Sequence, residues 1–93
     1  MERWEPPHDP DEIETRDIDF ADRLAPGETL SSASWTSTPA GLTQISASVD
    51  QSVATWKFSG GTAGADYEIT CRALTTPGGN TLEETVILRC RAR

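Results

Sequence analysis

The sequence predicts an all-β protein, an antiparallel β-sandwich of six to seven short strands preceded by an extended N-terminal arm. Three observations support this fold class. Apolar and polar residues alternate with a period of two in several runs, turn-forming residues separate the runs, and no run has the period of an amphipathic helix. The 93 residues provide for one domain with one modest core. We place the arm at residues 1–13 and the domain at residues 14–93.

The expected arm is rich in proline and acid. Residues 1–12 contain three prolines, which are unfavourable inside a helix or a sheet. Residues 1–23 hold nine acidic and three basic residues, whereas the other seventy residues hold six and five. Acid at this density opposes nucleic-acid binding and is typical of a solvated tail or of a strap that docks in a basic groove. In a strap, the large ring of Trp4 would be the anchor.

Six runs of residues have the pattern of a strand. In the first run, Ile18 and Phe20 alternate with Asp17 and Asp19, which indicates one buried and one solvated face. Turns rich in Gly, Pro, Ser and Asp separate the runs. The expected strands cover residues 14–20, 29–36, 42–49, 53–59, 67–74 and 81–91.

The strand patterns also predict the core. Leu30 and Trp35 have an odd spacing in their run, which predicts a bulge between them. Tyr67 follows Gly64 at the start of a strand, where a sandwich often places a Tyr whose hydroxyl holds the preceding corner. The residues expected to face the core are Ile18, Phe20, Leu30, Trp35, Ala54, Trp56, Phe58, Tyr67, Ile69, Cys71, Ala73, Val86, Leu88 and Cys90.

The two cysteines are expected to be free and buried. If Thr76 faces Thr81 across the last hairpin, Cys71 lies opposite Val86. Cys90 is then displaced from Cys71 by about four residues, or ~13 Å at ~3.3 Å per residue. A disulfide needs Cα atoms within about 7 Å. Two buried thiols that pack as small hydrophobic groups are therefore expected.

No motif predicts catalysis, a cofactor or a metal site. His8 is the only histidine, and we expect it to be exposed in the arm. The cysteines and His8 lack the spacing of a zinc site, and the acidic segments lack the loop Gly and terminal Glu of an EF-hand. Residues Gly60–Gly64 lack the Lys-Ser/Thr of a phosphate loop and are expected to form a strand corner.

Several segments, which together span about residues 14–91, resemble small immunoglobulin-like proteins found among the structural components of tailed bacteriophages. The resemblance implies an immunoglobulin-like sandwich and a non-enzymatic accessory protein of the virion. It concerns turns and core residues, so it specifies the architecture better than the role. The segments that carry it are Asp17–Phe20, Leu24–Leu30, Ser34-Trp35, Ser59–Thr70, Thr75-Thr76 and Gly78-Gly79.

The resemblance leads us to expect a head-decoration protein that docks through its arm. Its partner would be the major capsid protein, another virion structural protein or copies of itself, with no nucleic acid and no membrane. A neck or tail component, such as an adaptor or a tube-associated protein, and a bacterial adhesion or carbohydrate-binding sandwich are the alternatives. The sequence shows no secretion signal, so we expect a virion protein assembled in the host cytoplasm. The residues expected to contact the partner are Trp4, Pro6, Pro7, Asp9, Asp11, Glu12, Arg91 and Arg93.

Overall fold

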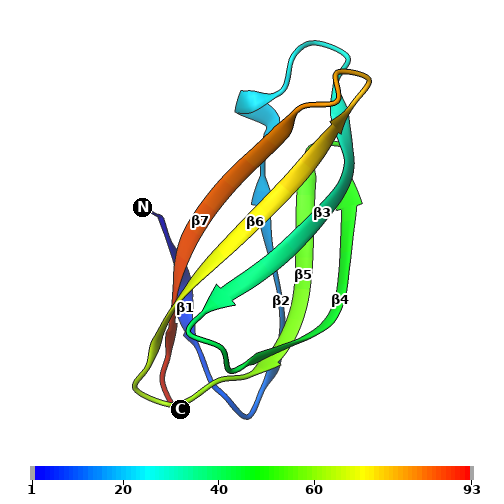
Figure 1. The fold of residues 1–93 in the computed structure, drawn as a ribbon. Coiled ribbons are helices and arrows are strands. Elements are labelled where there is room, and N and C mark those ends of the chain that lie inside the picture. Colours follow the sequence, from blue (N-terminus) through cyan, green and yellow to red (C-terminus); the bar gives the residue numbers. More distant parts are fainter. Residues whose placement is uncertain (1, 93) are drawn as a thin grey trace.

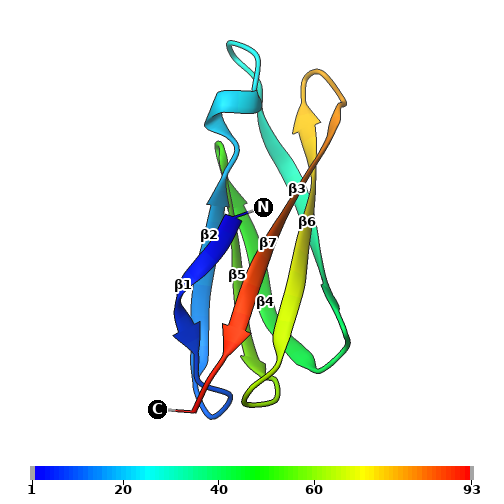
Figure 2. The same cartoon turned by 90° about the vertical axis from the view of Figure 1, so that its left-hand side faces the viewer.

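The computed structural model describes residues 2–92, which form seven strands and one short 3₁₀ helix. The strands lie in two layers, a four-stranded sheet in the order β1-β7-β6-β3 and a three-stranded sheet in the order β2-β5-β4 (Figures 1 and 2). Neighbouring strands are antiparallel, except that β1 and β7 are parallel. The elements are β1 (Glu2–His8), β2 (Ile13–Asp19), η1 (Ala21–Arg23), β3 (Thr29–Thr38), β4 (Leu42–Asp50), β5 (Val53–Gly60), β6 (Asp66–Thr76) and β7 (Thr81–Cys90).

The all-β class and the core are confirmed. The six strands expected from residue 14 onward correspond to β2–β7, and all fourteen residues expected to face the core are buried. Trp35 of one sheet stacks on Trp56 of the other, with ring centroids 5.4 Å apart and planes 4° from parallel. Trp56 in turn stacks on Phe58 at 4.6 Å. These three rings therefore join the two sheets through the middle of the sandwich.

Two local expectations about strands are also confirmed. The ladder between β3 and β6 is irregular between Leu30 and Ser32, so the odd spacing of Leu30 and Trp35 does mark a bulge. At the corner before β6, the amide N–H of Thr62 donates a hydrogen bond of 3.0 Å to the hydroxyl of Tyr67. The Tyr67 hydroxyl thus fixes the turn that leads into its own strand.

The register of the last hairpin was predicted wrongly by two residues. Leu74, and not Thr76, lies opposite Thr81, so Cys71 lies opposite Glu84. The turn is longer than expected because Thr75 accepts an amide hydrogen bond from Gly79 and donates its own amide to the Asn80 carbonyl. A shift of two residues keeps the same side chains in the core. It also leaves the cysteines unpaired, and both are free and buried as expected.

The N-terminal segment differs most from its prediction. Residues 2–8 form β1, which is part of the four-stranded sheet and pairs with β7 from Glu2 to Trp4 and again at His8. The irregularity between Trp4 and His8 coincides with Pro6 and Pro7. A proline is tolerated at the edge of a sheet, where its missing N–H leaves no ladder bond unmade. The expectation of an arm that stands apart from the domain is therefore corrected.

No helix among residues 2–92 has the length and apolar composition of a membrane span.

Candidate interaction surfaces

On one side of the sandwich β1 lies beside β2 (Figure 2), and Arg16 of β2 donates a hydrogen bond to the carbonyl of Pro6 in β1. The aromatic side chain of Trp4 closes this side. Trp4 is 9% exposed, and its ring lies 5.8 Å from Trp35 and 6.1 Å from Phe58, on which it stacks. The parallel register places Trp4 opposite Leu88, whose side chain is buried in the core. Trp4 is thus a core residue of its own domain, which corrects the interpretation of this ring as a surface anchor for a partner.

A buried polar cluster also joins β1 to β2. His8 is 0% exposed, which corrects the expectation that it is solvated. Its Nδ1 lies 2.7 Å from a carboxylate oxygen of Glu14, and its Nε2 lies 3.1 Å from the carbonyl oxygen of Gly60. Arg16 donates to the other oxygen of Glu14 from Nε and Nη2, and to the carbonyl of Pro6 from Nη2 at 2.6 Å. Both neighbours of the His8 ring are hydrogen-bond acceptors, so a ring nitrogen that carries a hydrogen can donate it to either of them.

The electrostatics of this cluster favour an ionised Glu14. Burial by itself raises the pKa of Glu14, but the hydrogen bonds and positive charges of His8 and Arg16 outweigh it and hold the pKa below its ordinary value. The carboxylate therefore carries its charge at neutral pH, between two groups that donate to it. This arrangement is a structural tie between the two sheets, since the His8 ring also packs 5.0 Å from Phe58.

Four of the other predicted docking residues, Asp9, Asp11, Glu12 and Arg91, lie just beyond the ends of β1 and β7, at the same end of the sandwich. Asp9 closes the turn between β1 and β2: its carboxylate accepts the amide of Asp11 at 3.0 Å, and its carbonyl accepts the amide of Glu12 at 2.9 Å. Arg91 donates its amide to the carbonyl of His8 and pairs with Asp66 at 3.2 Å. Pro6, Asp11 and Glu12 have exposed side chains, Pro7 is half-buried, and Arg93 lies outside the described residues.

The opposite side of the sandwich, formed by the edge strands β3 and β4, has a different chemistry. No residue from Thr29 to Val49 is charged. A groove of about 230 Å³ runs between the two strands. Ile45, at the irregularity in β4, is 46% exposed. Sequence reasoning missed this side, although the absence of charge was visible; which strands are edges became clear only with the topology. The groove is lined by Ser31, Ser32, Ala33, Ala47, Ser48 and Val49.

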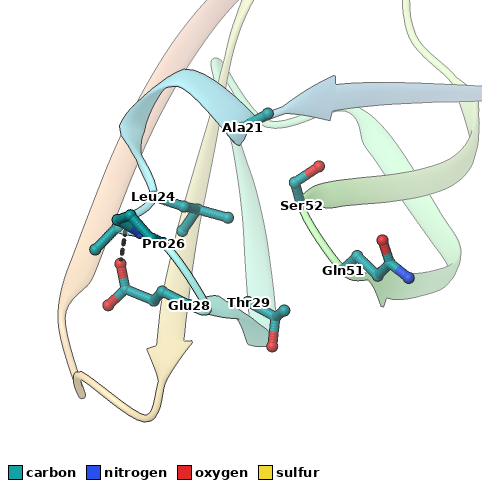
Figure 3. A pocket seen from close by; sticks show the side chains of 8 residues that line it. Ala21, Leu24, Pro26, Glu28, Thr29, Gln51 and Ser52 are labelled. Atoms are coloured by element: carbon teal, nitrogen blue, oxygen red, sulfur yellow. Dashed lines mark hydrogen bonds between the residues drawn. The ribbon is translucent and has the colours of Figure 1, made fainter.

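A pocket of about 350 Å³ opens at the end of the sandwich near η1 (Figure 3). Figure 3 shows Leu24, Pro26 and Glu28 on one side of it and Gln51 and Ser52 on the other. Glu28 accepts hydrogen bonds from the amide of Ala25 at 3.0 Å, the hydroxyl of Thr75 at 2.7 Å and the amide group of Asn80 at 3.2 Å. These bonds, that from Ala25 first, lower the pKa of Glu28. Glu28 thus ties the loop before β3 to the β6–β7 turn.

Neither thiol is suited to nucleophilic chemistry. Burial raises the pKa of Cys71 to about 12 and also raises the pKa of Cys90, so both are protonated at neutral pH. The Cys90 sulfur packs against Gly61, where a Cβ would come within 2.8 Å of it and the φ of +98° favours glycine. Across residues 2–92, His, Cys, Asp and Glu side chains do not gather in any group of three that could hold a metal ion.

Comparison with known proteins relates this chain to a family. Residues 8–89 match a family model described as podophage GP4 fiber-tail adaptor protein gp77. The matched region contains the last residue of β1, all of β2–β6, and β7 except for its last residue, Cys90. A search of curated proteins finds no match. Because the match covers most of the chain, including both edge strands β3 and β4, this protein belongs to the podophage GP4 fiber-tail adaptor gp77 family, a family of phage structural proteins.

Proposed function

We propose that this protein is a non-enzymatic component of a podophage virion that joins a fiber to the tail. The family match over residues 8–89 carries the proposal. It favours the tail-adaptor alternative over head decoration, and it makes a virion structural protein of the tail or fiber the expected partner in place of the major capsid protein. The structure is compatible with such a role, since an adaptor needs separate surfaces and the two sides of this sandwich differ in chemistry.

We also propose that the sandwich is immunoglobulin-like. Two features support this assignment. Strands β2, β5 and β4 form one sheet, and β3, β6 and β7 lie together in the other, as in constant-type immunoglobulin domains; β1 departs from that pattern, because it pairs with β7 and does not join the sheet of β2. The hydroxyl of Tyr67, near the start of β6, binds the backbone of Thr62 a few residues upstream, as in a tyrosine corner.

For one of the adaptor contacts we propose the acidic turn, defined as residues 9–12 between β1 and β2. Asp11 and Glu12 are exposed residues there, and Pro6 is exposed on the strand that precedes the turn. The turn is held in shape by the hydrogen bonds of Asp9, so its charges are presented on a fixed backbone. A basic surface on the tail or the fiber is the complementary partner, and charge of this kind mainly accelerates docking and sets orientation.

The proposal is tested by deleting the gene for this protein and purifying the particles. We expect particles that have heads and tails but lack fibers, and we expect the wild-type particle to contain far fewer copies of this protein than of the major capsid protein, counted by quantitative mass spectrometry. Particles that keep their fibers, or a copy number close to that of the capsid protein, would contradict the adaptor role.

The acidic turn is tested in the same system by complementation. Asp11→Lys should slow or reduce fiber attachment, because it places a positive charge against the proposed basic partner. Asp17→Lys is the matched control, since Asp17 is also exposed and acidic but lies on the outer face of β2. Equal attachment with both variants would assign the contact to another surface.

A further inference from the structure

The charges of this protein are confined to part of the chain. Residues 1–28 hold ten acidic and three basic residues, so they account for the whole net charge of −7. Residues 50–93 hold five of each sign. The 21 residues from Thr29 to Val49 hold none, although about five charged residues would be expected in a segment of this length at the average of the chain.

This uncharged segment forms two strand edges on one side of the molecule. β3 is the outermost strand of the four-stranded sheet and β4 is the outermost strand of the three-stranded sheet, so within residues 2–92 each has a ladder partner on one side only. Soluble proteins usually protect such edges with Lys, Pro or a bulge. Here the protection is limited to one irregularity in each strand and to the charge of Asp50 at the end of β4, which leaves Ser32–Thr38 and Ser46–Val49 regular and uncharged.

The side chains along this side are small and permit close approach. Serine, alanine and valine line the groove between the strands, and β4 from Thr43 to Ser48 is exposed throughout. An extended backbone can reach the free N–H and C=O groups of either edge without displacing a long side chain. Strand addition of this kind gains its affinity from main-chain hydrogen bonds.

We propose that the β3–β4 side of one copy pairs with the same side of a second copy. The charge distribution argues for this occupant. Ten of the fifteen acids belong to β1, β2 and the segments that follow them, and β1 and β2 are the opposite edges of the same two sheets. Two copies that meet through their neutral sides keep these acids apart, whereas contact through the acidic sides would place like charges together. A twofold axis makes such a contact complementary to itself.

The contact is tested by sedimentation velocity of the full chain from about 1 µM to about 1 mM, the range of weak to moderate protein association. We expect a concentration-dependent dimer. The double variant Thr36→Lys/Ser48→Lys should weaken the dimer about tenfold or more, because it places charge on both exposed edges. The control Ile13→Lys/Thr15→Lys makes the same change in net charge on exposed positions of β2 and should leave the dimer unchanged.

Hydrogen exchange gives a second measurement that does not depend on a variant. Amide exchange in the free edges of β3 and β4 should slow as the wild-type concentration rises, while exchange in β2 should not change. A chain that stays monomeric over the whole range, or a dimer weakened equally by the β2 control, would overturn the proposal. The result is independent of the adaptor role, because self-association is measured on the isolated protein and fiber attachment on the particle.

Discussion

The two lateral sides of this sandwich are built on opposite principles. The β1–β2 side is closed by a tryptophan and by a buried cluster of a histidine, a carboxylate and an arginine, which bind one another and the backbone. Strands β3 and β4 carry one charged residue, Asp50 at the end of β4, and the groove between them is lined by small side chains. The first side holds the domain together, and the second leaves backbone groups available to another chain. A segment rich in acid and proline can therefore belong to the stabilised part of a small sandwich, and its composition alone does not show that it is a free arm.

The largest effect on stability is expected from the removal of the Trp4 side chain. Trp4→Ala should lower the free energy of unfolding by about 3–5 kcal/mol, because it deletes a buried ring between Trp35 and Phe58. For a domain of this size the melting temperature should fall by more than 10 °C, roughly 4–8 °C per kcal/mol. Urea unfolding measures the first quantity and a thermal melt the second. An unchanged melt together with lost docking on the particle would restore the ring as a partner anchor.

The buried cluster gives the next largest effect, and it depends on pH. Glu14→Gln should cost about 2–3 kcal/mol at neutral pH, because it leaves Arg16 and His8 without their shared carboxylate. The pKa of Glu14 is lowered in the folded state, so its contribution is complete above the ordinary value of 4.5 and is lost as the pH falls through the folded pKa.

Urea unfolding of the wild type and of Glu14→Gln across this acidic range measures the difference. The gap between the two curves should narrow as the pH falls. Asp17→Asn, on the exposed face of the same strand, serves as the control and should follow the wild type. A constant gap would show that the carboxylate acts through its shape and not through its charge.

A smaller effect on stability is expected at the end of the sandwich near η1, where Glu28 joins two loops. Glu28→Gln weakens the bonds from Ala25, Thr75 and Asn80 that join two loops. The pKa of Glu28 is also lowered, so its contribution too is present above the ordinary value and lost as the pH falls through the folded pKa. Hydrogen exchange should accelerate first in the β6–β7 turn. Uniform acceleration over the whole chain would show that the end does not open separately.

The smallest effect is expected on the β3–β4 side. Ile45→Ser should change the free energy of unfolding by no more than about 0.5 kcal/mol, since the residue is half exposed at an irregularity of an edge strand. The same urea titration used for Trp4→Ala provides the measurement. A loss of unfolding free energy comparable to that of Trp4→Ala would show that the β3–β4 side stabilises the domain as much as the β1–β2 side does.

The strands from residue 14 onward could be predicted because their alternation reports burial directly. Ala54, Trp56 and Phe58 share one face by the geometry of a strand, whatever the rest of the fold. The pairing of β1 could not be predicted in this way. Local rules exclude Pro6 and Pro7 from the interior of a sheet, and they say nothing of an edge position that long-range pairing with β7 supplies.

The candidate surfaces were predictable only in part. The acidic turn was visible from composition, and Asp11 and Glu12 are exposed in it, but their contact with a partner stays a prediction. Trp4 was assigned the wrong role because its burial depends on Trp35 and Phe58, which are distant in sequence. The β3–β4 side could not be predicted without the strand order. The uncharged segment forms edges because β3 and β4 are each the last strand of their sheet, and the sequence does not show this.

The parallel pairing of β1 and β7 has a mechanical consequence. Because the strands are parallel, the chain enters β1 at one end of the pair and leaves β7 at the other end. A force that separates residue 2 from residue 92 therefore pulls β1 and β7 in opposite directions along their common axis. The ladder bonds between them are then sheared together and do not open one after another. A joint that transmits tension between a fiber and a particle gains resistance from such a geometry, even though each bond contributes only about 1 kcal/mol to equilibrium stability.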